Sequence, residues 1–245
     1  MLFFPTSIYL VDFLEGITDI HNHILPGIDD GSPDVGTSLK MIQAMKALGI
    51  KKCIATPHIM EDYYGNTAGS IKDTFIKTKE ALATTEGKGF IIGAASEYMM
   101  DGQLDHIIET ETYLCVYKKY LLTELSYFQR PDHLEDLVFK MCQKELIPIL
   151  AHPERYRYIK SIETYEDLKK RGFELQLNLL SLTTHYGKDA QRKAQSLLEK
   201  GLFDFLGTDA HTPSHLEKIK EIKIKKKQVP YLEKLVENHK LVFDL

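Results

Sequence analysis

The sequence is poor in cysteine, and its cysteines are not arranged for disulfides or for a thiolate zinc site. Cys53, Cys115 and Cys142 are widely spaced, odd in number and include no C-x-x-C pair. None has an arginine six positions later, as a cysteine phosphatase loop would need, and neither a G-x-S-x-G elbow nor a P-loop motif occurs. These absences argue against thiol, serine and P-loop enzymes. They also favour a reducing, cytoplasmic location.

The chain also lacks a long apolar run and an excess of positive charge. No segment reaches the roughly 18 apolar residues that a membrane span needs. The apolar start of the chain has no basic residue and is interrupted by Asp12 and Glu15. We therefore expect residues 2–14 to form a docking strand or helix rather than a signal peptide. With a net charge of -4, a nucleic-acid partner is not expected.

Short apolar runs and amphipathic helical patterns alternate along the 245 residues. This alternation predicts a mostly parallel sheet or barrel within one domain, residues 1–245. The predicted strands are 18–21, 52–56, 90–97, 120–125, 147–152, 174–178 and 203–209. The predicted helices are 33–48, 69–85, 131–145, 161–171, 188–200 and 214–238, the last broken by Pro230. We expect helix ends at Gly49, Gly172 and Gly201, and a solvated helix face over the Lys-rich run 218–227.

Metal-capable side chains follow six of the seven predicted strands. In α/β barrels the chemistry lies at the carboxyl ends of the strands, where such side chains converge. Taken alone, the pair His21-x-His23 fits two surface histidines as well as two ligands of one metal ion. The other candidate ligands at the strand ends favour a metal site. The eight candidate ligands are His21, His23, His58, Glu97, Glu124, His152, Asp209 and His211.

Five histidines and at least three carboxylates are too many ligands for one ion. Mixed donors of this kind suit Mn²⁺, Fe²⁺ or Zn²⁺, so we expect two or three ions with Glu97 bridging two of them. Clustered ions clamp a phosphoryl group and convert a bound water to hydroxide near neutral pH. The sequence therefore predicts a metal-dependent hydrolase and favours a phosphoesterase.

Residues close to these ligands have more than one interpretation. Asp29 fits a turn or a support for a ligand, and Asp30 is expected near the metals. Arg155, three residues after His152, fits a phosphate contact and a surface ion pair equally well. The histidines outside the ligand set are predicted to be surface residues: His106, His133, His185, His215 and His239. Four aromatic residues after ligand-bearing strands fit either packing or an aromatic substrate pocket: Tyr63, Tyr64, Tyr127 and Phe128.

Six motifs together resemble a known family. They are DIHNHILPGIDDG (19–31), ATPH (55–58), SEY (96–98), TELS (123–126), AHPER (151–155) and GTDAH (207–211). The chain resembles the PHP (polymerase and histidinol phosphatase) superfamily, and more narrowly the bacterial manganese-dependent protein-tyrosine phosphatases of capsule and exopolysaccharide biosynthesis. The resemblance implies a distorted (β/α)7 TIM-like barrel, the PHP fold. It also implies manganese, a phosphotyrosyl protein substrate and, as partner, a bacterial tyrosine autokinase that controls polysaccharide export.

By motif position the resemblance also implies a ligand set for three ions. The first ion would be held by His21, His23, Glu97 and Asp209, the second by Glu97, Glu124 and His152, and the third by Asp30, His58 and His211. Arg155 matches the family's phosphate-contacting arginine, and we take Arg155, Glu97 and Asp209 as the catalytic candidates. Family members often have another arginine after the DAH motif. Residues 210–218 contain none, so Lys218 or a basic residue elsewhere would have to replace it.

Two other functions stay open. A PHP-type phosphoesterase acting on a small phosphomonoester, such as histidinol phosphate, would use the same metals. Phosphate release from a phosphotyrosyl peptide, compared with release from the small ester, separates it from a tyrosine phosphatase. A non-catalytic metal-binding regulator would bind manganese without turnover. The oligomeric state is also open, and a homo-oligomer is compatible with the sequence.

Overall fold

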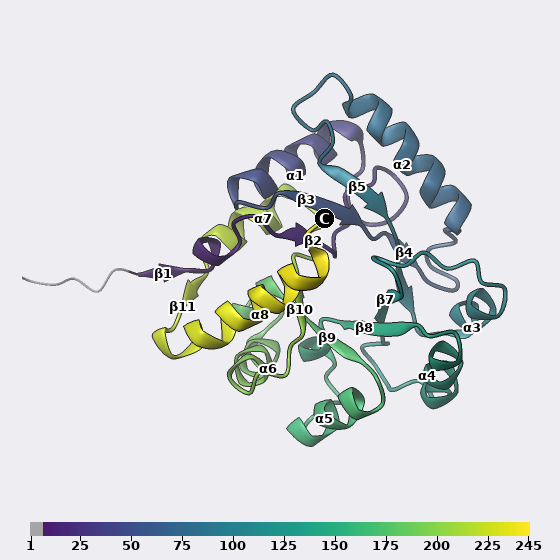
Figure 1. Cartoon of the computed structure of the whole chain (residues 1–245), viewed down its shortest axis with the longest axis vertical. Helices are drawn as coiled ribbons and strands as arrows, with labels where there is room; N and C mark the ends of the chain where they lie inside the picture. The colour runs from purple at the N-terminus through teal and green to yellow at the C-terminus, as the bar shows by residue number, and fades with distance from the viewer. Residues whose placement is uncertain (1–6) are drawn as a thin grey trace, which may run out of the picture.

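Seven parallel strand positions form a barrel with helices around its outside (Figure 1). The computed structural model describes residues 7–245. The barrel strands are β2 (Thr18–Asp19), β3 (Lys52–Ala55), β4 (His58–Ile59), β5 (Ile91–Ala94), β6 (Glu97–Met99), β7 (Tyr120–Glu124), β8 (Ile147–Ala151), β9 (Glu174–Asn178) and β10 (Phe205–Gly207). β3 and β4 are two parts of one strand interrupted at residues 56–57, and β5 and β6 are interrupted at residues 95–96. The predicted distorted (β/α)7 barrel is therefore confirmed.

The interruptions divide the barrel wall into two ladders. One ladder has the order β10-β9-β8-β7-β6-β4 and the other has the order β2-β3-β5, with every neighbouring pair parallel. Most residues of these strands are buried, as expected for strands covered on both faces.

Between β10 and β2 the barrel closes through the segments that carry predicted ligands. The amide of Asp209 donates to the carbonyl of His21 at 2.7 Å, and the amide of His23 donates to the carbonyl of Ala210 at 2.9 Å. Beneath these bonds, the buried carboxylate of Asp19 accepts from the amide of Thr208 at 3.0 Å and from its hydroxyl at 2.7 Å. Closure of the fold therefore brings the first and last ligand motifs together.

The helices follow most of the predicted ranges. They are α1 (Val35–Ala47), α2 (Ala68–Leu82), α3 (Gly102–Glu109), α4 (Leu134–Gln143), α5 (Ile162–Lys170), α6 (Lys188–Glu199), α7 (Pro213–Lys220) and α8 (Val229–Phe243). Gly49, Gly172 and Gly201 have φ of 83°, 102° and 66° just beyond α1, α5 and α6, as predicted for helix ends. The eight-residue helix α3 was not predicted.

Residues 214–238 are mostly helical, as predicted, but the prediction that Pro230 breaks the helix is wrong. The segment contains α7, then β11 (Lys223–Ile224), the 3-10 turn η4 (Lys226–Gln228) and α8. Pro230 lies in the first turn of α8, where its missing N–H is not needed, so it starts a helix instead of interrupting one. The Lys-rich run 218–227 consequently crosses three elements and does not form a single helix face.

The start of the chain docks on this same region. β1 (Ile8–Tyr9) pairs antiparallel with β11, and the 3-10 turn η1 (Leu10–Phe13) follows it. This agrees with the predicted docking segment as far as it is described, while residues 2–6 of that prediction lie outside the described residues. Within residues 7–245, no helix is both long and apolar enough to cross a membrane.

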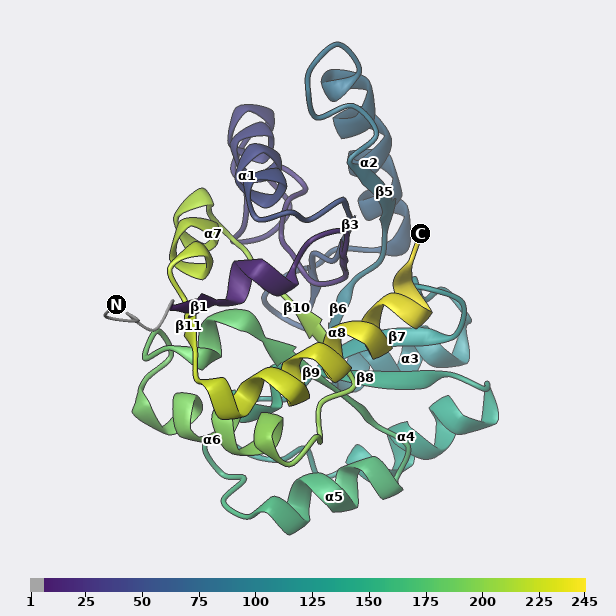
Figure 2. The same cartoon turned by 60° about the vertical axis from the view of Figure 1, so that its left-hand side comes forward.

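Helix α8 covers the barrel at the amino ends of the strands (Figures 1 and 2). The ring of Phe243 packs against Tyr120 and Phe205, the first residues of β7 and β10. His239 is fully buried, so the prediction that it is a surface residue is wrong. Its Nε2 donates to the carbonyl of Thr18 at 2.8 Å, and its Nδ1 accepts from the amide of Leu206 at 3.4 Å. His239 thus joins β2 to β10 at the end of the barrel opposite the ligands.

The burial of His239 predicts a pH-dependent contribution to stability. Burial, together with the nearby charge of Lys240, lowers the pKa of His239 from 6.5 to about 4. The folded protein keeps the ring neutral in a range where the unfolded chain binds a proton. The stability that this residue contributes is therefore present above pH 6.5 and is lost as the pH falls toward 4, and the loss between pH 7 and pH 5 is about 2 kcal/mol.

His239→Gln removes the titrating group and keeps an amide that can donate to the Thr18 carbonyl. We expect the free energy of unfolding to fall by about 2 kcal/mol less in this variant than in the wild type between pH 7 and pH 5. Urea unfolding of both proteins at the two pH values, at one fixed metal concentration, measures the difference. If the free energy of unfolding depends on pH in the same way in both proteins, His239 is not the residue responsible for this loss of stability.

Candidate metal centre

Side chains from the carboxyl ends of the strands meet in one buried cluster. It contains three groups whose ligand atoms all lie within 4.8 Å of one another. These groups are His21, His23, Glu97 and Asp209; His23, Asp30, His58 and His211; and His58, Glu97 and Glu124. The first group is the same as the first predicted ligand set, and the second contains all three residues of the third predicted set.

Several atoms that face the centre of the cluster have no hydrogen-bond partner among residues 7–245. Five buried atoms are in this position: His21 Nε2, His23 Nε2, His58 Nδ1, Glu97 Oε2 and Glu124 Oε1. His21 Nε2 lies 3.1 Å from Glu97 Oε2, and His58 Nδ1 lies 3.1 Å from Glu124 Oε1. Unpaired buried polar atoms are destabilising by several kcal/mol unless another partner satisfies them. Imidazole and carboxylate donors converging in this way fit divalent transition-metal ions.

Hydrogen bonds behind the ligands fix how two of the imidazoles point. His21 Nδ1 donates to Gln176 Oε1 at 2.8 Å, and His23 Nδ1 donates to Asp29 Oδ2 at 2.8 Å. In each ring the other nitrogen, Nε2, faces the cluster, and the hydrogen bond at Nδ1 leaves Nε2 as the nitrogen that can bind a metal ion. Of the two interpretations of Asp29, the geometry agrees with a support for a ligand. Gln176 has no counterpart among the sequence predictions.

Asp209 connects the cluster to a guanidinium group. Its Oδ1 lies 3.4 Å from both His21 Nε2 and His23 Nε2. Its Oδ2 accepts from Arg155 at 2.8 Å and from the Asn178 amide at 2.7 Å. Asp209 has a φ of 49°, in the left-handed region that is unfavourable for residues with a Cβ. The fold therefore holds this carboxylate in a strained backbone conformation with both oxygens engaged.

His152 lies beside both carboxylates of the ligand set that the resemblance implied for it. Its Nε2 forms a 2.8 Å hydrogen bond with Glu97 Oε1 and lies 3.8 Å from Glu124 Oε2. The group that contains Glu97 and Glu124 also includes His58, which was predicted for the third ion. His152 also has a left-handed φ of 37°. It lies beside the ligand atoms, and its coordination of a metal stays a prediction.

Two glycines in the ligand motifs are required by close approach. A Cβ at Gly31 would lie 2.1 Å from the carbonyl oxygen of His23, and a Cβ at Gly207 would lie 2.7 Å from the Cβ of His21. Side chains at these positions would push the first two predicted ligands out of place. The motifs DIHNHILPGIDDG and GTDAH thus end or begin with glycine because their backbones pack directly on the histidines.

Asp30 lies at the solvent side of the cluster. Its side chain is 53% exposed, and its Oδ1 lies 3.5 Å from His58 Nε2 and 3.4 Å from His211 Nε2. Partial burial raises the pKa of this carboxyl, but the imidazoles of His211 and His58 outweigh burial and lower it to about 2. An ionised carboxylate at this edge is consistent with its predicted place near the metals.

A cleft of about 480 Å³ opens beside Arg155. We call it the aromatic cleft, and it is lined by Tyr127, Phe128, Arg155, Arg157, His185 and Tyr186. The guanidinium of Arg155 lies 4.8 Å from the centre of the Tyr127 ring and 4.1 Å from that of Tyr186, so two aromatic rings hold it. Arg155 forms its ion pair with the buried carboxylate of Asp209, and its contact with a phosphate stays a prediction. Tyr186 and Arg157 were missed because neither belongs to a recognisable motif.

The remaining aromatic and histidine predictions divide between surface and site. Tyr63 is 80% exposed, whereas the Tyr64 ring stacks on His58 with 5.0 Å between ring centres. His106, His133 and His185 are exposed, as predicted. His215 is half-buried, and its Nδ1 accepts weakly from the amide of His211 at 3.5 Å.

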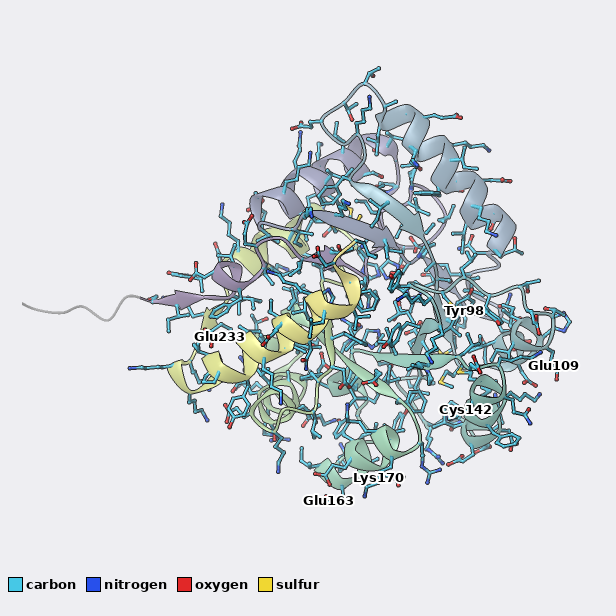
Figure 3. The ribbon with its side chains drawn as sticks, viewed as in Figure 1. Tyr98, Glu109, Cys142, Glu163, Lys170 and Glu233 are labelled. Carbon is cyan, nitrogen blue, oxygen red and sulfur yellow. The ribbon has the colours of Figure 1, made fainter. Side chains whose placement is uncertain are left out.

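The three cysteines take no part in the cluster. Cys53 is buried in β3, where burial and the charge of Asp19 raise the pKa of its thiol. Burial raises the pKa of Cys115 to about 11. Cys142 lies at the periphery on α4, where Figure 3 labels it. The arrangement agrees with the absence of a thiolate nucleophile.

The chain is similar to proteins of known type over nearly its whole length. A family model described as capsular polysaccharide synthesis, CpsB/CapC, matches residues 17–241. The sequence is 31% identical to tyrosine-protein phosphatase YwqE of Bacillus subtilis over 202 residues, covering 79% of this chain and 76% of that protein. It is 23% identical to tyrosine-protein phosphatase CpsB of Streptococcus pneumoniae over 219 residues, covering 85% of this chain and 90% of that protein.

Solved structures also match most of the chain. A crystal structure from a study of YwqE of Bacillus subtilis and CpsB of Streptococcus pneumoniae, described as metal-dependent tyrosine phosphatases, superposes with a TM-score of 0.79 at 27% identity. That match covers 92% of this chain and 94% of the other. An organophosphorus hydrolase of Deinococcus radiodurans matches with a TM-score of 0.54 at 13% identity, covering 98% and 99%, which shows a shared fold only.

The support that Gln176 gives His21 predicts an effect on metal binding. Gln176→Leu leaves His21 Nδ1 without an acceptor, so we expect the apparent affinity for Mn²⁺ to fall about 10- to 100-fold. Gln176→Glu keeps an acceptor and should stay within a few-fold of the wild type. Calorimetric titration of the metal-free proteins measures this, with thermal unfolding of each apo-protein as the control. Equal affinity in the wild type and Gln176→Leu would contradict the role.

Proposed function

The chain belongs to the CpsB/CapC family of capsular polysaccharide synthesis proteins, and on this basis we propose that it is a metal-dependent phosphatase that hydrolyses phosphotyrosine on a protein. The observation that carries the proposal is the pairing of the metal cluster with the aromatic cleft. The cluster offers unpartnered nitrogen and oxygen donors, and the cleft beside it offers aromatic rings and a guanidinium. A phosphorylated aromatic side chain matches both parts.

The cluster residues are proposed to hold two or three ions. Divalent ions at such a site supply positive charge for the phosphoryl oxygens and a water that loses its proton near neutral pH. Glu97 belongs to two of the three groups, which supports its role as a shared ligand. Burial and the imidazoles of His21 and His58 act on this carboxyl in opposite directions, and the imidazoles prevail and lower its pKa. Glu97 is therefore an ionised ligand in the buried cluster.

Arg155 is proposed to contact the phosphoryl group. Its position is set in advance by the Asp209 carboxylate on one side and by the Tyr127 and Tyr186 rings around it. A guanidinium held in this way stabilises the charge that develops during phosphoryl transfer without rearranging. The residues lining the cleft would enclose the aromatic ring of the substrate and orient its phosphate toward the cluster.

The donor chemistry supports manganese as the proposed metal. The three groups contain imidazoles and carboxylates and no thiolate, which suits Mn²⁺ and also admits Fe²⁺ or Zn²⁺. By analogy with the named relatives, we propose a tyrosine autokinase of polysaccharide synthesis as the phosphotyrosyl partner. Three free cysteines are compatible with the proposed cytoplasmic location.

Removal of a ligand tests the proposed site. We expect His21→Ala and Asp209→Ala to lose at least about 100-fold in phosphate release from a phosphotyrosyl peptide, because loss of a supporting residue alone costs 10- to 100-fold. EDTA should inactivate the wild type, and Mn²⁺ should restore it. Thiol alkylation should have no effect on the reaction centre. Unchanged turnover in either variant, with folding verified by circular dichroism, would overturn the site.

Arg155→Lys tests the phosphate contact. Lysine keeps the charge but loses the planar fork and its stacking between two rings, so we expect kcat/KM to fall about 100-fold. Metal content should stay at the wild-type value, which separates this effect from ligand loss. An unchanged kcat/KM in Arg155→Lys would show that Arg155 does not contact the phosphoryl group in the proposed way.

A further inference from the structure

Arg157 differs from every other arginine in the chain. The sequence contains five arginines, and four of them form ion pairs with carboxylates: Arg130, Arg155, Arg171 and Arg192. Arg157 forms none with any residue of the described part, and its side chain is exposed. An unpaired guanidinium that lines a cleft next to a candidate active site is available to bind an anion from solution.

The aromatic cleft around Arg157 has a consistent chemistry. Its walls come from the segments that follow β7, β8 and β9, which is the same end of the barrel as the metal cluster. Three of its six lining residues are aromatic, two are arginines and one is histidine, and none is acidic. Phe128 is 93% exposed at its edge. A ligand that is both aromatic and anionic suits this lining.

The two arginines of the cleft differ in what they can do. Arg155 is committed to Asp209 and to the rings of Tyr127 and Tyr186, so it belongs to the reaction centre. Arg157, two residues further along the chain, has no such commitment. A cleft of about 480 Å³ is too large for one phosphate and lies within the range of sites that hold drug-sized ligands. It therefore has room for residues adjoining a phosphotyrosine.

His185 adds a hydrogen-bond donor to the same cleft. Lys218 Nζ approaches His185 Nδ1 at 3.5 Å and donates to it, which leaves the ring proton on Nε2. Burial and the charges of Lys218 and Arg155 lower the pKa of His185, so the ring is neutral near pH 7. Its edge packs on Tyr186 with 4.6 Å between ring centres. Lys218 is therefore engaged by His185. Arg157 is the cation lining the cleft that has no ion-pair partner in the described part of the chain.

We propose that Arg157, assisted by His185, binds an anionic side chain that flanks the phosphotyrosine in the protein substrate. This inference rests on the proposed function and deepens it, because it makes the enzyme selective for phosphotyrosines with an acidic neighbour. The anion is a carboxylate or the phosphate of a second phosphotyrosine, since a guanidinium binds both. Residues 210–218 contain no arginine, and Arg157 would supply a second guanidinium beside Arg155, as a specificity contact rather than at the reaction centre.

The test compares three peptides that share one phosphotyrosine and differ in a flanking residue, which is alanine, glutamate or a second phosphotyrosine. The manganese-loaded wild type should show kcat/KM about threefold to tenfold higher for the glutamate peptide than for the alanine peptide. Arg157→Gln should reduce this ratio to about one. Arg157→Lys keeps the charge and should retain part of it, which guards against misfolding of the first variant. Comparing the peptide that carries a second phosphotyrosine with the glutamate peptide shows whether Arg157 prefers a phosphate or a carboxylate as the flanking anion.

Arg171→Gln is the matched control. It removes one guanidinium at the end of α5, just before β9, and thus at the opposite end of the barrel from the cleft. Its peptide preference should equal that of the wild type. No preference in the wild type, or a preference that persists in Arg157→Gln, would overturn the inference while leaving the proposed function intact.

Binding separates this inference from failure of the proposed function. The same peptides with a hydrolysis-resistant phosphonate in place of phosphotyrosine are titrated into each manganese-loaded protein. If no phosphotyrosyl peptide is hydrolysed, the proposed function fails. In that case, tighter binding of the glutamate peptide than of the alanine peptide, lost in Arg157→Gln, would still support the proposed role of Arg157. If the affinity is the same for all three flanking residues, the proposed role of Arg157 in the cleft is wrong as well.

Discussion

Five buried nitrogen and oxygen atoms at the carboxyl end of the barrel face one another and have no hydrogen-bond partner in the part of the chain that the structure describes. Their burial is unfavourable in the protein alone, and the surrounding structure is arranged to keep them in place. Gln176 and Asp29 fix the rings of His21 and His23 from behind. The backbone bond from Asp209 to His21 closes the barrel at the same point. A site for divalent ions explains why the fold accepts this unfavourable cluster.

Asp209 extends this arrangement toward the substrate side. One of its oxygens faces the histidines and the other accepts from Arg155, so cluster and guanidinium are held in a fixed relation. Tyr127 and Tyr186 then hold Arg155 from the aromatic cleft. Charge is distributed accordingly, with carboxylates concentrated in the cluster and cations in the cleft. Recognition of a phosphorylated aromatic group follows from the contact between these two regions.

Much of the fold and the site could be predicted from the sequence, because the period of apolar residues locates strands and parallel strands end at one rim. The motif around His21 and the other strand-end residues were therefore identified correctly as neighbours. That His58 also lies beside Glu97 and Glu124 could not be foreseen, since it depends on side-chain direction at an interrupted strand. Gln176 looks like an ordinary strand residue until its amide meets His21. The burial of His239 follows from how α8 crosses the barrel, which no local pattern records.

The proposed chemistry depends on the binding of divalent metal ions by this buried cluster as a group. An anomalous-difference map at the manganese absorption edge, from crystals of the manganese-loaded protein, would locate such ions. We expect two or three strong peaks enclosed by His21, His58, Glu97 and Asp209, with none of comparable height elsewhere. A map with no peak inside the cluster, or with manganese bound only on the outer surface, would contradict it.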